Sequence, residues 1–168
     1  MILVYKAGRR VWRVRGLLWL TIAVAVWFWF WGLDLYQTYG LRPADGGKLA
    51  PHGVRLAWLV FMIGFGLAGA AGMWFYARAY VAALWYDEAL DQVRIATVGL
   101  WPSNQVLPRA QVQTVDFHAG DFWAIERTVE APWYTIRVSG RKRLLVLDAQ
   151  GTILDRPLLG RVLGKGNR

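Results

Sequence analysis

Histidine and acidic side chains are the groups in this sequence that could bind a metal ion or transfer a proton. The two histidines are His52 and His118, and a haem with two axial imidazoles would need both. They fall in segments that we expect on opposite sides of a membrane, so they cannot share one iron. A single axial ligand or a haem shared with another chain stays open, but we favour histidines that are solvated or hydrogen-bonded.

The acidic residues give a second set of candidates. Asp87, Glu88 and Asp91 are close in sequence, but no group with an oppositely shifted pKa accompanies them, as an acid–base pair requires. We therefore expect a solvated turn. Asp34 directly follows an uncharged run, and we expect it at a membrane interface, with a proton relay as the less favoured alternative.

The sequence also lacks the common motifs of enzymes and metal sites. It has no cysteine, which excludes disulfides, thiolate metal ligands and cysteine nucleophiles. Phosphate-binding glycine loops, the serine elbow of α/β-hydrolases, zinc-ligand spacings and dinucleotide fingerprints are missing as well. We expect no catalytic residue, no metal site and no cofactor.

Two uncharged stretches determine where the other residues must lie. Residues 17–33 and 56–77 contain no charged side chain, and the hydrophobic share of the chain, 56%, is too high for an ordinary soluble fold. Each stretch is long enough to cross a bilayer as a helix, the first only just. Tryptophan and phenylalanine crowd the end of the first stretch, which favours a true span over a signal peptide with small residues at its cleavage site.

The two stretches divide the chain into three parts. Residues 1–16 form a basic N-terminal arm, and residues 17–79 form a transmembrane helical hairpin with spans at about 17–35 and 56–78. Residues 80–168 form a small antiparallel β-rich domain with a short C-terminal helix, which gives a membrane α+β fold. Strands are expected at residues 81–86, 92–98, 111–117, 133–138 and 143–147. Residues 81–86 could instead prolong the second helix.

Local signals define two features of this β-rich domain. Ser139 and Gly140 form a plausible tight turn, so the basic residues after them would lie at the shoulder of a hairpin. Near the end of the chain, Asp155 would cap the short helix, Pro157 would lie in its first turn and Gly164 would end it.

Small and aromatic residues are candidates for contacts within the membrane. Gly64, Ala68 and Gly72 recur every fourth residue, and Gly69 borders them, so they form a groove that another helix can approach closely. We favour packing against the first span over packing against a partner's helix. The expected interfacial anchors are Trp27, Trp29, Trp31, Trp74 and Tyr76.

Basic residues are candidates for contacts with lipid or partner proteins. The expected contact residues are Arg9, Arg10, Arg13, Arg141, Lys142 and Arg143. Acidic residues balance the basic ones in the β-rich domain, which argues against a nucleic-acid groove. The N-terminal arm has basic and no acidic side chains, so the positive-inside rule puts it on the cytoplasmic side of a bacterial membrane or the matrix side of a mitochondrial one.

The layout and the C-terminal segment VSGRKRLLVLDAQGTILDRPLLGRVLG resemble the mitochondrial inner-membrane family of transmembrane protein 223. That family has two spans, then a basic run after a glycine, a leucine-rich strand that ends in Asp, a following Gly and a final Asp-Arg/Asn…Val-Gly turn. The matching positions here are Ser139, Gly140, Arg141, Leu145, Asp148, Gly151, Asp155, Arg156, Leu163 and Gly164. Serine replaces the family's lysine before Gly140, and leucine replaces the aromatic residue after the basic run, so the chain resembles a divergent relative.

The resemblance implies a mitochondrial inner-membrane protein that takes part in building cytochrome c oxidase, and it implies no catalytic residues. We expect a non-catalytic accessory subunit of a respiratory-chain complex, with cytochrome c oxidase (complex IV) as the expected complex. Its partners would be other subunits and membrane lipid such as cardiolipin, and both termini would lie in the matrix. The alternatives are an assembly factor for cytochrome c oxidase and a stand-alone membrane protein with a lipid- or ligand-binding β domain.

Overall fold

The computed structural model describes residues 1–41, 47–101, 103–124, 127–140 and 144–164, and within these ranges the side chains of Val115 and of residues 121–124 and 127–130 are not described. The chain forms two compact units. One unit contains residues 16–75, and the other combines residues 1–15 with residues 76–168. We call the first the helical hairpin and the second the β domain.

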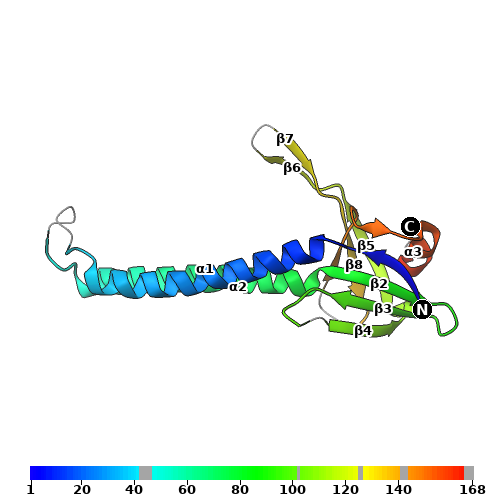
Figure 1. Cartoon of the computed structure of the whole chain (residues 1–168), viewed down its shortest axis with the longest axis horizontal. Helices are drawn as coiled ribbons and strands as arrows, with labels where there is room; N and C mark the ends of the chain where they lie inside the picture. The colour runs from blue at the N-terminus through cyan, green and yellow to red at the C-terminus, as the bar shows by residue number, and fades with distance from the viewer. Residues whose placement is uncertain (42–46, 102, 125–126, 141–143, 165–168) are drawn as a thin grey trace. The chain divides into compact units, whose positions relative to one another are not determined.

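Two long helices, α1 (Arg10–Thr38) and α2 (His52–Ala79), account for the helical hairpin (Figure 1). Each is long and apolar enough to cross a membrane, and only 11% of its most apolar 18-residue window is buried. A core helix of a soluble protein with this hydropathy would be mostly buried. The predicted spans therefore correspond to α1 and α2, although α1 begins at Arg10, earlier than we expected.

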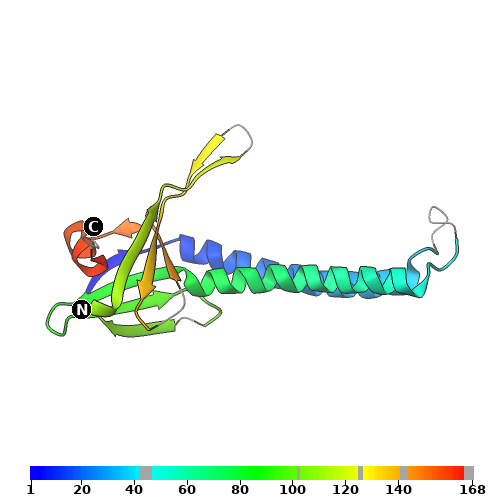
Figure 2. The same cartoon turned by 180° about the vertical axis from the view of Figure 1, so that it is seen from behind.

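The β domain contains a five-stranded and a three-stranded antiparallel sheet, and a separate hairpin (Figure 2). In spatial order, the larger sheet consists of β10 (Thr152–Ile153), β1 (Ile2–Lys6), β2 (Val81–Asp87), β3 (Gln92–Thr97) and β4 (Ser103–Pro108). The smaller sheet consists of β5 (Val112–His118), β8 (Trp133–Val138) and β9 (Leu144–Asp148), after a 3₁₀ turn at Arg109–Gln111. Strands β6 (Asp121–Ala124) and β7 (Arg127–Glu130) pair only with each other, and their hairpin extends away from both sheets (Figure 2).

The N-terminal residues are part of the larger sheet. Strand β1 pairs on one side with β2, where Ile2 lies opposite Tyr86, and on the other side with β10, where Tyr5 lies opposite Ile153. Its sequence, ILVYK, is rich in residues that favour strands. The arm that we expected at residues 1–16 therefore contains a strand and the first turn of α1. Strand β1 precedes α1, and strand β2 follows α2. Because β1 and β2 pair with each other, the start of α1 and the end of α2 lie on the same side of any membrane that the hairpin crosses.

The core of the β domain lies between the sheets and beneath the C-terminal helix α3 (Arg156–Leu163). Residues from both sheets are fully buried, among them Leu84, Ile95 and Ile136. Helix α3 packs against β1 and β5 and buries three leucines and Val162, of which Val162 is fully buried. A parallel bridge between Tyr80, just before β2, and Val146 of β9 links the two sheets.

Several local predictions are confirmed by these elements. Strand β8 has the predicted bounds, and β2, β3, β5 and β9 lie within a residue or two of theirs. Since residues 81–86 belong to β2, the alternative that they prolong the helix is wrong. The Asp155 carboxylate caps α3 by accepting a hydrogen bond from Leu158 N at 2.8 Å, and Gly164 follows the helix with a positive φ of 54°. Strands β1, β4, β6, β7 and β10 were not predicted.

Candidate functional site

The strongest polar site in the β domain is a group of side chains around Asp148, at the end of β9. Its Oδ2 atom pairs with the Arg10 guanidinium and accepts a hydrogen bond of 3.0 Å from the Tyr80 hydroxyl. Its Oδ1 atom accepts one of 2.9 Å from Gln150 N, while the Gln150 side chain accepts one of 2.5 Å from Arg10. The Tyr5 hydroxyl donates to the Asp148 backbone oxygen at 3.0 Å. We call these five residues the Asp148 cluster.

The Asp148 cluster is neutral overall and its hydroxyls stay protonated. Burial raises the pKa of Tyr5 and of Tyr80 well above the ordinary tyrosine value, and the neighbouring Asp148 carboxylate raises both further. Both hydroxyls therefore remain donors at neutral pH. The carboxylate of Asp148 accepts hydrogen bonds from three donors, and the one from Arg10 connects the start of α1 to β9.

A pocket of about 440 Å³ opens beside the Asp148 cluster. It is lined by Arg10, Tyr76, Tyr80, Ala131, Pro132, Trp133, Val146 and Asp148. Most of its wall is apolar, and the polar groups of Arg10 and Asp148 lie at one part of it. Pockets that bind small molecules typically measure about 300–1,000 Å³ and combine apolar walls with a few polar groups, so this one has the size and lining of a binding site for an acyl chain or an apolar side chain.

The histidines lie in different units and each contacts an aromatic residue. His52 forms a hydrogen bond of 3.0 Å with the Tyr36 hydroxyl in the helical hairpin. His118 stacks on Trp133 in the β domain, with ring centroids 5.0 Å apart. Within the described ranges, no group of three or more histidine, aspartate or glutamate side chains is arranged to hold a metal ion.

The small-residue stripe of α2 is exposed in the helical hairpin. A Cβ atom added to Gly64, Gly69 or Gly72 would have nothing within 4 Å. Among the described glycines of α2, Gly66 is the one that meets α1, where an added Cβ would lie 3.0 Å from Ala25 Cα. The expectation that the stripe packs against the first span is therefore wrong. Gly64, Ala68, Gly69 and Gly72 are left available to another helix.

The contact at Gly66 could have been predicted only if the register between α1 and α2 had been known. The stripe was chosen because its members recur every fourth residue, which shows that they share a face but not which face meets α1. The contact at Gly66 is reinforced by Phe28 and Phe65, whose rings meet edge to face at 5.6 Å. On α1, Gly32 makes the matching close approach, with an added Cβ 3.3 Å from Met62 Cβ.

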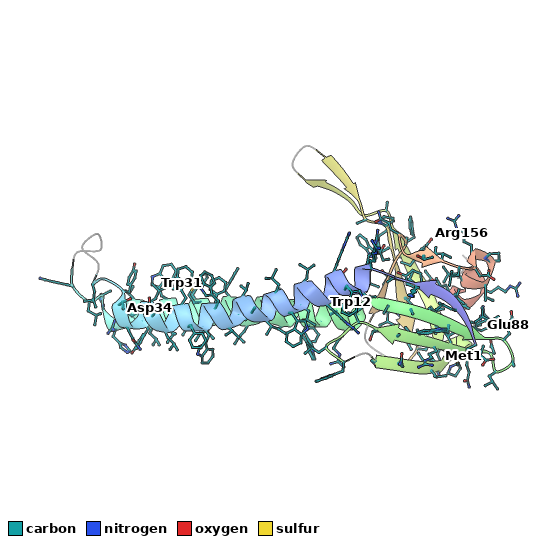
Figure 3. The ribbon with its side chains drawn as sticks, in the orientation of Figure 1. Met1, Trp12, Trp31, Asp34, Glu88 and Arg156 are labelled. Atoms are coloured by element: carbon teal, nitrogen blue, oxygen red, sulfur yellow. The ribbon has the colours of Figure 1, made fainter. Side chains whose placement is uncertain are left out.

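The predicted aromatic anchors occupy different environments. Trp27, Trp29 and Trp31 are exposed on α1, and Trp27 stacks on Trp31 with centroids 5.0 Å apart. Figure 3 shows Trp31 and Asp34 toward the end of the hairpin that carries the connecting loop. Near the other end of the helices, Trp74 is half-buried and Tyr76 is exposed at the pocket.

The predicted basic contacts are only partly described. Arg9 and Arg13 are exposed around the start of α1, whereas Arg10 belongs to the Asp148 cluster. Arg141, Lys142 and Arg143 lie outside the described residues. The turn at Ser139 and Gly140 that precedes them is present, and Gly140 has a φ of 81°.

A comparison with protein-family models matches residues 15–165 to the TMEM70/TMEM186/TMEM223 protein family. The chain belongs to this family. The match covers the helical hairpin and most of the β domain, including β9 with Asp148. Searches of the curated proteins and of the solved structures find no match. Family membership and the two apolar helices together fit a mitochondrial membrane protein.

Proposed function

We propose that this protein is a non-catalytic assembly factor of the mitochondrial inner membrane that helps to build a respiratory-chain complex, with cytochrome c oxidase as the expected target. The observation that carries the proposal is the family match over residues 15–165, which covers the helical hairpin and most of the β domain together. The resemblance of the C-terminal segment to the transmembrane protein 223 family supplies the link to cytochrome c oxidase.

Two features of the structure support a role in binding proteins. The β domain has its own buried core, so it does not need a partner subunit in order to fold, as suits a factor that joins and leaves a complex. The helical hairpin exposes the small-residue stripe of α2, along which the helix of a membrane subunit could pack closely. Both termini would lie in the matrix because the basic start of the chain favours that side.

A permanent accessory subunit of the same complex is the second candidate. It would use the same exposed helix faces and the same lipid contacts, including cardiolipin near Arg9 and Arg13, so geometry alone supports it equally. The difference is the stage at which the protein is bound. An assembly factor is present on incomplete complexes, while an accessory subunit stays on the mature one.

Native gel separation of gently solubilised membranes, with mass spectrometry along the gel, distinguishes these candidates. We expect the protein to migrate with subassemblies that lack some subunits of cytochrome c oxidase, and to be far less abundant than the catalytic subunits. Migration at equal stoichiometry with the mature complex would identify an accessory subunit. Migration alone would contradict both and favour a stand-alone membrane protein.

A pair of variants tests whether the stripe of α2 carries the association. Valine at both Gly64 and Gly72 should weaken comigration with subassemblies, because bulk on this face keeps a partner helix at a distance. Gly53→Val is the matched control, since an added Cβ at Gly53 also meets nothing within 4 Å but the residue lies at the start of α2. Equal comigration of both variants would rule the stripe out as the contact.

A further inference from the structure

The turn between β3 and β4 carries an unusually exposed pair of apolar side chains. Trp101 is 86% exposed, the highest value for a large hydrophobic residue in the described part of the chain, and Leu100 beside it is 37% exposed. A single exposed apolar residue needs no explanation. Two adjacent ones, one of them a tryptophan, call for a surface that accepts them.

Hydrogen bonds fix this turn against the end of α2. Gly99 N donates to Ala77 O at 3.1 Å, and Val98 N donates to Tyr80 O at 3.1 Å. Gly99 has a φ of 37°, and a Cβ there would lie 3.0 Å from the Trp101 backbone oxygen. The turn therefore needs glycine, and it holds Leu100 and Trp101 next to the last residues of α2.

The length of α2 sets the depth of that position in a bilayer. The uncharged run of residues 56–77 extends roughly 33 Å as a helix at about 1.5 Å per residue, while the hydrocarbon core is about 30 Å thick. Ala77 then lies at the edge of the hydrocarbon, where Arg78 begins the polar side. Because Gly99 is hydrogen-bonded to Ala77, this placement of α2 brings the backbone that carries Leu100 and Trp101 close to the edge of the hydrocarbon.

Other residues near these ends of the two helices have the composition of a membrane interface. Trp12, near the start of α1, is 72% exposed and lies 5.6 Å from the Arg15 guanidinium (Figure 3). Tyr76 is exposed, as are the cationic side chains of Arg9 and Arg13. Tryptophan and tyrosine beside basic residues favour the boundary of a bilayer with anionic lipid, which favours lipid over a partner protein as the surface that Trp101 meets.

We propose that the β3–β4 turn inserts Leu100 and Trp101 into the headgroup region of the leaflet where α2 ends. The β domain then touches the bilayer through this turn in addition to its two helix connections. The inference rests on the membrane location in the proposed function, but it does not depend on any respiratory-chain partner.

Spin labelling of the full chain in vesicles of phosphatidylcholine and cardiolipin tests the insertion. The chain has no cysteine, so one cysteine introduced as Trp101→Cys carries the only nitroxide label. Collision of the label with oxygen, which concentrates in the bilayer, is compared with collision with a water-soluble nickel chelate. Leu100→Cys gives a second reading of the same turn if one substitution perturbs it.

Leu90→Cys is the matched control. Leu90 is 64% exposed and lies in the β2–β3 turn, at the other end of β3. The six residues of β3 separate the two turns by about 20 Å at about 3.4 Å per residue. Glu88, in the same turn as Leu90, lies at the opposite end of the β domain from Trp12 (Figure 3).

We expect the ratio of oxygen to nickel collision at residue 101 to exceed that at residue 90 several-fold. A ratio equal to that at residue 90 would show the turn in water and overturn the inference. Protection from both reagents would show a protein contact, such as a second copy, and would overturn it as well. A label at Leu67→Cys, in the middle of α2, tests the membrane location separately from the insertion of the turn. If that label also collides mainly with the nickel chelate, α2 does not span the bilayer and the membrane location itself is wrong.

Discussion

At the scale of single residues, Asp148 makes the contacts that hold the start of α1 to the smaller sheet. The sequence identified Asp148 only as the end of a leucine-rich strand in a family-like motif. Its partner Arg10 is 138 positions away, and nothing in either local sequence indicates that the two should meet. Arg10 was expected to contact lipid or a partner because it lies in a basic segment. A basic segment looks the same in sequence whether its arginine forms an ion pair within the protein or faces lipid.

Replacing the carboxylate in Asp148→Asn should lower the melting temperature of the β domain. The variant loses the ion pair with Arg10 and weakens the hydrogen bonds from Tyr80 and Gln150 N. Hydrogen bonds to charged groups contribute about 1.5–3 kcal/mol, and the pair, with Arg10 32% and Asp148 18% exposed, falls at the lower end of that range. Near-ultraviolet circular dichroism in detergent measures the transition. Asp116→Asn, on an exposed position of β5, is the control, and an equal change in both variants would contradict the role of the Asp148 cluster.

At the scale of elements, the sequence predicted those whose signals are local. Strand β8 and helix α3 were found because alternating apolar residues, a capping Asp155 and a terminal Gly164 are all readable within a few residues. Strand β10 has only two residues, and β4 alternates weakly, so neither gives a clear pattern. Strand β1 was missed because basic residues follow it closely, and we interpreted the whole segment of residues 1–16 as a basic arm.

The helical hairpin offers a contrast between two glycines of α2 that lie three residues apart. Gly66→Val should destabilise the hairpin, because the added Cβ alone would lie 3.0 Å from Ala25 Cα and 3.2 Å from Phe28 Cβ. Overpacking of this kind typically costs about 1–3 kcal/mol. Gly69→Val should have little effect, since its Cβ meets nothing within 4 Å.

Thermal unfolding in detergent, followed by far-ultraviolet circular dichroism, compares the two variants. Both substitutions add the same side chain to the same helix, so helix propensity cancels in the comparison. A lower melting temperature for Gly69→Val than for Gly66→Val would mean that the stripe, and not Gly66, packs against α1.

At the scale of the whole molecule, the β domain is built from two separate parts of the chain. Residues 1–15 and 76–168 form one compact unit, with β1 between β10 and β2 in the larger sheet. The order of the hairpin and the β-rich segment was predicted correctly, but local patterns could not show that the first residues belong to the β domain. Strands that are far apart in the sequence pair where the other strands leave a sheet edge unpaired. Which edge stays unpaired depends on the whole sheet, so local sequence patterns do not show it.

Because residues 1–15 and 76–168 form a compact unit of their own, we expect the β domain to fold without the helical hairpin. A chain in which residues 16–75 are replaced by a flexible linker of about twenty glycine and serine residues should fold as a water-soluble protein, because such a linker spans roughly 25 Å on average. Hydrogen exchange should show slow amides in β1, at Tyr5 and its neighbours, as well as in β2 and β3. Deleting residues 2–7 from the same chain should abolish that protection in β2, which would lose one of its two neighbouring strands. Protection that is unchanged by the deletion would mean that the larger sheet forms without its N-terminal strand, and that β1 only covers an edge that is already stable.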